Sequence, residues 1–234
     1  MGVAPTAMQR LAHTDGELAT SRACAAFNIP MGLSSFATTT LEDVAEAAGD
    51  ASNPHVLQLY LFEEREHSRK LIARAKKAGY KAVFLTVDTP MLGRRNLEIR
   101  NQFKLPAHFS IANFTEQGDE DPEAHAEQEG KKEEKAAERR ASASGFTDKQ
   151  GKRTAPKGPI TFHSHAANPT LCWERDIEWL KRECGDEMQV WVKGIATAED
   201  ALLAVHHGVN GIVVSNHGGR QLSEFTTRCL NLPL

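Results

Sequence analysis

The sequence predicts an α/β fold in which parallel strands alternate with helices. Three observations predict it: short apolar runs recur along the 234 residues, amphipathic helical patterns separate most of them, and polar residues follow each run directly. Short apolar runs are typical of strands that are buried on both faces, as they are in a parallel sheet. Strands that alternate with helices at this spacing indicate βα units.

The apolar runs predict where the strands lie. These runs are Met31–Ser34, Val56–Leu61, Ala82–Val87, Val190–Val192 and Gly211–Val214. One more strand is expected ahead of Pro5, with Met1 already inside it. The sheet is therefore expected to contain six strands.

Helices are predicted between these runs from apolar residues that recur on one helical face. The expected helices are Asp15–Phe27, Leu41–Ala48, Glu63–Ala78, Trp173–Cys184 and Ala198–His207. Thr40 followed by Asp43 resembles a capping box at the start of the second helix. Glycines placed after helices, such as Gly79 and Gly208, are typical helix ends.

Composition narrows the class of protein. The net charge of −3 is small, so nothing global indicates nucleic acid or an anionic membrane surface as a partner. No apolar run approaches the ~20 residues that a membrane helix needs. The four cysteines lack metal-site spacing and are expected to be free thiols of a reducing compartment. We therefore expect a soluble intracellular protein without a metal site.

One segment interrupts the βα pattern. Residues 116–158 are rich in Glu, Lys, Ala, Ser and Gly, with almost no branched apolar side chains. Such a composition cannot bury enough apolar surface to order itself, so it is expected to be a disordered insertion in one βα loop. Residues 1–222 then form one interrupted domain, and residues 223–234 form a tail that looks unrelated to it.

Polar residues stand at the end of each of the six expected strands. Examples are Ser34 after the second strand, Thr86 and Asp88 after the fourth, and Lys193 after the fifth. In a (β/α)₈ barrel the active site forms at these carboxyl ends. The fold class is therefore predicted as a partial (β/α)₈ barrel that contains roughly strands one to six and lacks strands seven and eight.

The last strand leads into the most informative motif, Ser215–Leu222. It places His217 and Arg220 directly after the apolar run, with two glycines between them. An imidazole titrates near neutral pH, and a guanidinium holds a carboxylate through two parallel hydrogen bonds. The pair suits a site that holds a small acid and moves a proton.

The strand-end motifs together carry a family resemblance. They are Val3–Gln9, Leu33–Ser35, Leu57–Tyr60, Leu85–Pro90, Val192–Gly194 and Ser215–Arg220. In this order and spacing they resemble the FMN-dependent α-hydroxy-acid oxidase and dehydrogenase family, whose members include glycolate oxidase, lactate oxidase and flavocytochrome-type lactate dehydrogenase. The match extends from residue 2 to about Leu222, apart from the charged insertion.

The resemblance implies an FMN that lies across the barrel mouth. Backbone groups around Pro5, Thr6 and Ala7 would contact its ring. Further cofactor contacts are implied for the side chains of Ser34, Gln58, Thr86 and Ser215. Lys193 would lie near N1 of the ring, where a cation stabilises the reduced flavin anion.

The resemblance also implies how substrate is held and oxidised. Arg220 and Arg95 would bind the substrate carboxylate, with Arg94 as the alternative to Arg95, and Tyr60 would hydrogen-bond the substrate. Phe36 stands at a substrate-side position where relatives often carry a larger residue, which leaves the specificity open.

The resemblance also implies two residues that act in proton transfer. His217 would be the general base and Asp88 would hold its imidazole. Whether His217 takes the α-carbon proton or the hydroxyl proton stays open.

Two functions remain open at this point. The first is oxidation of an L-2-hydroxy acid to a 2-oxo acid, with oxygen or a redox protein as electron acceptor and a homo-oligomer as a further expectation. The second is an inactive truncated fragment of such an enzyme with weak or no FMN binding, because the loops after strands seven and eight commonly form the phosphate site. The compartment is open between cytoplasm, peroxisome and mitochondrion.

Overall fold

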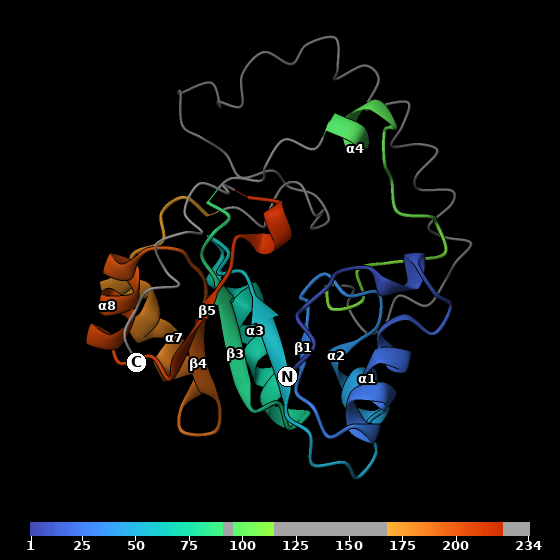
Figure 1. The fold of residues 1–234 in the computed structure, drawn as a ribbon, viewed down its shortest axis with the longest axis horizontal. Helices are drawn as coiled ribbons and strands as arrows, with labels where there is room; N and C mark the ends of the chain where they lie inside the picture. Colours follow the sequence, from blue (N-terminus) through green and yellow to red (C-terminus); the bar gives the residue numbers. More distant parts are fainter. Residues whose placement is uncertain (91–95, 115–167, 222–234) are drawn as a thin grey trace. The chain divides into compact units, whose positions relative to one another are not determined.

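A computed structural model describes residues 1–90, 96–114 and 168–221 (Figure 1). Its described part contains a parallel sheet of five strands in the order β1-β2-β3-β4-β5, which is also their order along the chain. The predicted parallel α/β class is therefore confirmed, with βα units added one after another. The predicted insertion 116–158, the tail 223–234 and both Arg94 and Arg95 lie outside the described residues.

The strands follow the apolar runs closely. They are β1 (Met31–Leu33), β2 (His55–Leu59), β3 (Ala82–Thr86), β4 (Gln189–Ile195) and β5 (Gly211–Val214). Neighbouring strands pair in parallel, and one irregularity interrupts the register of β4 with β5 between Lys193 and Ile195. The Lys-Gly segment therefore lies at a local bulge of the sheet.

The expected first strand is reduced to a single bridge between Val3 and Met31. Val3 N donates to Pro30 O at 2.9 Å, and Gly32 N donates to Val3 O at 2.8 Å. Pro5 follows, and a proline has no backbone N–H with which to extend the ladder. The sheet thus shows five strands plus this bridge in place of the six that were predicted.

The five predicted helices agree with the observed ones to within a few residues, whereas α4, η1 and η3 were not predicted. The α-helices are α1 (Gly16–Ala26), α2 (Leu41–Glu46), α3 (Arg65–Lys77), α4 (Asn96–Arg100), α7 (Glu178–Cys184) and α8 (Ala198–His206). Short helical turns are η1 (Gln9–Leu11), η2 (Trp173–Ile177) and η3 (His217–Gly219). The predicted cap at Thr40 is confirmed, because its hydroxyl accepts from Asp43 N at 3.2 Å.

One predicted helix is built differently. The stretch Trp173–Cys184 begins with a π-helical turn, η2, and continues as α7. Asp176 in this turn is buried, and its carboxylate accepts from Cys172 N at 2.8 Å and from Arg65 of α3 at 2.6 Å. These contacts join the start of the helix to its neighbour.

The two faces of the sheet differ in burial. Helices α1, α7 and α8 pack on β1, on β4 and on β4 with β5 respectively. Residues on the helix-covered face, such as Leu57, Val83 and Val192, are fully buried and form the core. On the opposite, inner face, Phe84 and Trp191 are lateral neighbours in the register and are only half-buried.

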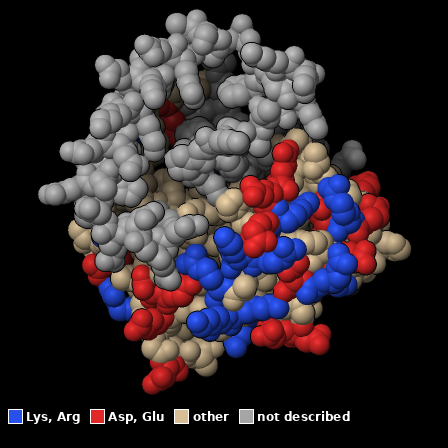
Figure 2. Space-filling view, turned by 180° about the vertical axis from the view of Figure 1, so that it is seen from behind, with Lys and Arg blue, Asp and Glu red and all other residues tan. Residues whose placement is uncertain are grey.

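Ion pairs join the helices at the surface. Arg74 of α3 donates to both carboxylate oxygens of Glu42 at 2.7 Å, which lowers the pKa of that carboxyl. Arg69 of α3 reaches Glu183 of α7 at 3.2 Å. On the face seen in Figure 2, Lys and Arg side chains accordingly lie among Asp and Glu side chains.

The described ranges contain neither a candidate membrane span nor a candidate metal site. None of the helices there has the length and hydropathy needed to cross a membrane. The same ranges hold no group of three or more His, Cys, Asp or Glu side chains arranged to bind a metal ion.

Because the two faces of the sheet differ in burial, the same Val→Ala substitution is expected to lower the unfolding free energy by different amounts on each face. Val83→Ala removes a fully buried side chain from the helix-covered face, so we expect a loss of about 2 kcal/mol of unfolding free energy. Val213→Ala is the matched control, because Val213 is half-buried on the inner face and should cost less than about 1 kcal/mol. Urea unfolding measures both values. Equal losses would contradict the assignment of the core to one face.

Candidate functional site

A cavity of about 460 Å³ lies at the carboxyl ends of the strands. Cavities of ~300–1,000 Å³ are typical of small-molecule sites. Its lining residues come from nearly every predicted strand end: Ala4, Pro5, Thr6, Ala7, Met8, Leu11, Ser34, Phe36, Gln58, Tyr60, Thr86, Glu98, Phe103, Lys193, Ser215, His217, Gly218 and Arg220. The structure thus brings all but two of the predicted site residues to one cavity wall. The exceptions are Asp88, which contacts His217 from behind, and Arg95, which is outside the described residues.

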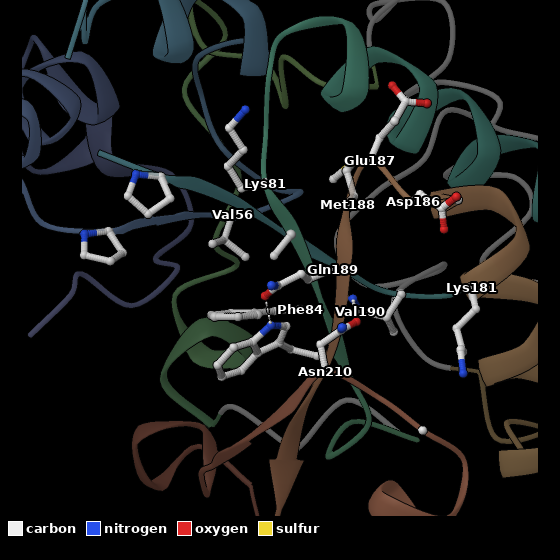
Figure 3. A pocket seen from close by; sticks show the side chains of 16 residues that line it. Val56, Lys81, Phe84, Lys181, Asp186, Glu187, Met188, Gln189, Val190 and Asn210 are labelled. Carbon is white, nitrogen blue, oxygen red and sulfur yellow. Dashed lines mark hydrogen bonds between the residues drawn. The ribbon is translucent and has the colours of Figure 1, made fainter. Parts of the chain in front are cut away.

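A second and larger cavity, of about 860 Å³, lies at the opposite, amino-terminal edge (Figure 3). Gln189 and Phe84 line it from the inner face, and Lys81 and Lys181 lie toward its margins (Figure 3). None of the predicted site residues is among its lining residues. We assign the candidate site to the carboxyl edge, because the buried charged groups converge there and parallel α/β folds bind their ligands at that edge.

Four polar side chains form a row across one wall of the site: Ser34, Gln58, Thr86 and Lys193. All are buried, and each follows or belongs to a different strand. Ser34 Oγ donates to Gln58 Oε1 at 3.4 Å, and Gln58 Nε2 donates to Thr86 Oγ1 at 2.9 Å. This row therefore offers hydrogen-bond donors and acceptors to a polar ligand in the cavity.

Lys193 is the buried cation of this wall. Burial lowers the pKa of its ammonium, and the nearby Asp88 carboxylate opposes this shift. Its Nζ lies 3.9 Å from Asp88 Oδ2, which is beyond hydrogen-bond range. A bound anion would relieve the cost of burying this charge.

His217 and Asp88 form a close pair. His217 Nδ1 lies 2.8 Å from Asp88 Oδ1, and the histidine ring lines the cavity. An ionised carboxylate only accepts hydrogen bonds, so Nδ1 is the donor in this contact, and in the neutral ring Nε2 then keeps its lone pair. The pair therefore supplies an oriented proton acceptor.

The backbone around His217 is locally strained. His217 and Gly218 have φ of 61° and 66°, in the left-handed region that favours glycine. Ser215 Oγ accepts from His217 N at 3.0 Å, and Asn216 Oδ1 accepts from Gly219 N at 3.2 Å. These short-range bonds explain why the motif carries Ser, Asn and Gly beside the histidine.

Gly194 makes room for Asp88. Its φ is 105°, and a Cβ at this position would lie 2.6 Å from Asp88 Cβ and 2.8 Å from its Oδ2. The glycine after Lys193 is therefore required both by its backbone conformation and by the close approach of the carboxylate.

The cavity also contains residues near or beyond Arg220 that were not predicted from the sequence. Arg220 has 60% of its side chain exposed, and its NH2 lies 3.7 Å from Glu98 Oε1 of α4. Phe103, Met8 and Leu11 also line the cavity without having been predicted. Helix α4 is too short to show a helical apolar pattern in the sequence, so nothing in the sequence indicated that Glu98 lies beside Arg220.

Two residues predicted separately, Phe36 and Tyr60, lie close together in the cavity wall. The rings of Phe36 and Tyr60 have centroids 5.7 Å apart, and both line the cavity. They give the cavity wall an aromatic surface.

A buried carboxylate, Glu17, holds two loops of the site together. It accepts from Gln9 N at 3.0 Å, from Thr38 N at 2.9 Å and from Thr39 Oγ1 at 2.9 Å. The first contact anchors the segment after Pro5, and the others anchor the loop after β1. Glu17 was not predicted as a site residue, because an acidic residue in the first turn of a helix by itself indicates only a favourable helix start.

Comparisons with known proteins agree with this geometry. A sequence profile described as FMN-dependent dehydrogenase matches residues 1–233. The chain is 41% identical over 222 residues to oxidase FUB9 of Fusarium oxysporum f. sp. lycopersici, a match that covers 95% of this chain and 48% of that protein. It is 42% identical over 220 residues to 2-hydroxyacid oxidase 1 of Homo sapiens, covering 94% of this chain and 51% of that protein.

A solved structure gives the same result. Mandelate oxidase with (S)-4-hydroxymandelic acid matches with a TM-score of 0.68 and 33% identity, over 95% of this chain and 52% of that one. The chain spans about half the length of the curated relatives that it matches.

Gly194→Ala is expected to damage the site through two effects. A left-handed backbone costs a non-glycine residue about 1–2 kcal/mol, and the new methyl group would also displace Asp88. Gly49→Ala is the control, because Gly49 has a φ of 62° with no atom within 4 Å of the added Cβ, so it bears the backbone cost alone. Chemical denaturation should give a larger loss for Gly194→Ala. A loss no greater than that of Gly49→Ala would rule out the steric role.

Glu17→Gln tests the loop clamp. The amide keeps one accepting oxygen and loses the other, so one buried hydroxyl or amide donor loses its partner at a cost of about 1–3 kcal/mol. Glu46→Gln, at an exposed position of α2, should change stability by less than about 0.5 kcal/mol. Thermal unfolding of the two variants measures the difference, and similar melting temperatures would be evidence against the clamp.

Proposed function

Because the chain belongs to the FMN-dependent dehydrogenase family, we propose that its carboxyl-edge cavity holds the flavin ring of FMN and supports the oxidation of an L-2-hydroxy acid to a 2-oxo acid. FMN is the cofactor that names this family. The main support for the proposal is that His217, paired with Asp88 at 2.8 Å, lines the same cavity as Lys193 and Arg220.

The residues present fit a flavin ring. The row of Ser34, Gln58, Thr86 and Lys193 offers both donors and acceptors along one wall. The backbone of residues 4–8 lines the cavity as well. We assign Pro5, Thr6 and Ala7 to backbone contact with the ring, and Ser215 to a further cofactor contact. Lys193 is the cation in place to offset negative charge on the ring.

Proton transfer is assigned to His217. When bound, FMN supplies the acceptor for the two electrons of the oxidation. His217 Nε2 takes a proton from the substrate, and Asp88 stabilises the resulting imidazolium through Nδ1 at 2.8 Å. Asp88 also keeps the ring in the tautomer that leaves Nε2 free to accept.

The substrate class follows from charge and from the relatives. Arg220 suits a carboxylate because its planar fork donates two parallel hydrogen bonds, and it already lies 3.7 Å from a carboxylate oxygen of Glu98. Arg95 is proposed as the second carboxylate ligand, and Tyr60 as a hydrogen-bond donor to the substrate. Phe36, which lines the cavity, is proposed to contact the side chain of the substrate.

We further propose oxygen as the electron acceptor, since the relatives are named oxidases, with a redox protein as the alternative. Residues 1–222 are proposed as one domain interrupted by the charged segment 116–158.

Anaerobic flavin reduction tests the proposal. The purified chain is mixed with FMN, its affinity is measured by flavin fluorescence, and glycolate, L-lactate or (S)-mandelate is then added. We expect the flavin absorbance to bleach with at least one acid. His217→Asn should retain the bound flavin and slow bleaching by about 10²–10⁴-fold, the usual contribution of a general base. Asparagine is chosen because it tolerates the left-handed backbone at this position.

His206→Asn is the matched control, since His206 is exposed at the end of α8. It should bleach at the rate of the unmodified chain. Bleaching by His217→Asn at that same rate would remove His217 from the mechanism. A chain that takes up no flavin would instead support the alternative of an inactive fragment.

A further inference from the structure

A second hydrogen bond joins the same two segments that carry the His217–Asp88 pair. Gln221 Nε2 donates to Thr89 Oγ1 at 2.9 Å. Thr89 directly follows Asp88 at the end of β3, and Gln221 lies four residues after His217. Thr89 is buried, so its hydroxyl needs partners within the protein.

These contacts belong to a chain of hydrogen bonds, termed the relay, in which the donors and acceptors are fixed. The Gln221 amide donates to the Thr89 hydroxyl, and Thr89 Oγ1 donates its single proton to Asp88 Oδ1 at 3.0 Å. The same carboxylate oxygen accepts from His217 Nδ1 at 2.8 Å. Because a hydroxyl has one proton, the donation from Gln221 leaves that proton for Asp88.

Without this relay Asp88 has a competing partner. Its Oδ2 is buried, accepts no hydrogen bond from the described residues, and lies 3.9 Å from Lys193 Nζ. Rotation of the carboxylate toward the ammonium would shorten that contact and lengthen the one to His217. The Thr89 hydroxyl opposes the rotation by holding Oδ1 beside Nδ1.

We propose that Thr89 and Gln221 are positioning residues, which fix the Asp88 carboxylate and, through it, the Nδ1–H tautomer of His217. The catalytic consequence rests on the function proposed above, whereas the tautomer is a property of the chain alone. Among the described residues, the charged groups that contact His217 or line the cavity with it are Asp88 after β3, Lys193 on β4, Arg220 beside η3 and Glu98 on α4. Of these, Asp88 is the group that Thr89 contacts.

Nuclear magnetic resonance of the flavin-free chain tests the tautomer directly. The ¹⁵N signals of the neutral His217 ring are assigned by their loss in His217→Asn. We expect the proton on Nδ1 in the unmodified chain. Thr89→Val, which keeps the shape and removes the hydroxyl, should raise the ratio of the Nε2–H to the Nδ1–H tautomer by about tenfold, equivalent to about 1.4 kcal/mol. Thr89→Ser should restore the original ratio.

Gln221→Glu tests whether the direction of the hydrogen bond to Thr89 matters or only the packing of the residue 221 side chain. The new carboxylate has the same shape but only accepts, so it draws the Thr89 proton away from Asp88 and should shift the tautomer ratio in the same direction as Thr89→Val. Gln189→Glu, at the amino-terminal edge, adds the same charge and keeps an acceptor for Trp191 Nε1, so it should leave the ratio unchanged.

With bound FMN and substrate, Thr89→Val should slow bleaching about tenfold at unchanged flavin affinity. An unaltered tautomer ratio in Thr89→Val, or equal effects of Thr89→Val and Thr89→Ser, overturns the relay. If Thr89→Val fails to fold, as judged by cooperative melting, the ratio in Gln221→Glu decides. Failure of the flavin to bind would count against the proposed function and would leave the tautomer result standing.

Discussion

The parallel register of the five strands is the constraint on which the site depends. Strands that run in one direction end at one edge, so residues far apart in the chain meet there. Ser34, Gln58, Thr86 and Lys193 follow one another across the sheet because β1 to β4 are neighbours in that order. A slip of one residue in any strand would turn its polar side chain from the cavity into the helix-covered core.

Around this framework, the site concentrates unfavourable conformations and buried charge. His217 has a left-handed backbone, Gly194 has a φ of 105°, and Lys193 is a buried ammonium whose pKa is lowered by its surroundings. Each of these features costs stability, and the helix-covered core and the Glu17 contacts stabilise the fold around them. Such a distribution is typical of a site in which geometry takes precedence over local stability.

Local signals account for the parts of the structure that were predicted from sequence. Apolar runs located the strands, and the Thr40 cap and the glycines located the helix boundaries, because these signals act within a few residues. Apart from Phe36, the strand-end motifs contain all the cavity residues for which a role was predicted. Tertiary contacts account for what was missed: the burial of Glu17, the approach of Glu98 to Arg220 and the bond from Gln221 to Thr89 all join distant segments. The predicted first strand is reduced to a single bridge in the structure, because Pro5 ends the pairing there.

The order of the strands also bears on how the chain folds. About 22 residues separate β2 from β3, whereas roughly a hundred separate β3 from β4, although both pairs are hydrogen-bonded neighbours. Loop-closure entropy grows only logarithmically, by about 0.6 kcal/mol for each doubling of length, so the longer connection costs the folded state little more than about 1.2 kcal/mol. The loop-closure entropy must be lost before the contacts between β3 and β4 can form. It therefore slows folding more than it lowers the stability of the final sheet. We expect the docking of β4 and β5 onto the first three strands to be the slow step, so that Lys193 and His217 reach Asp88 late in folding.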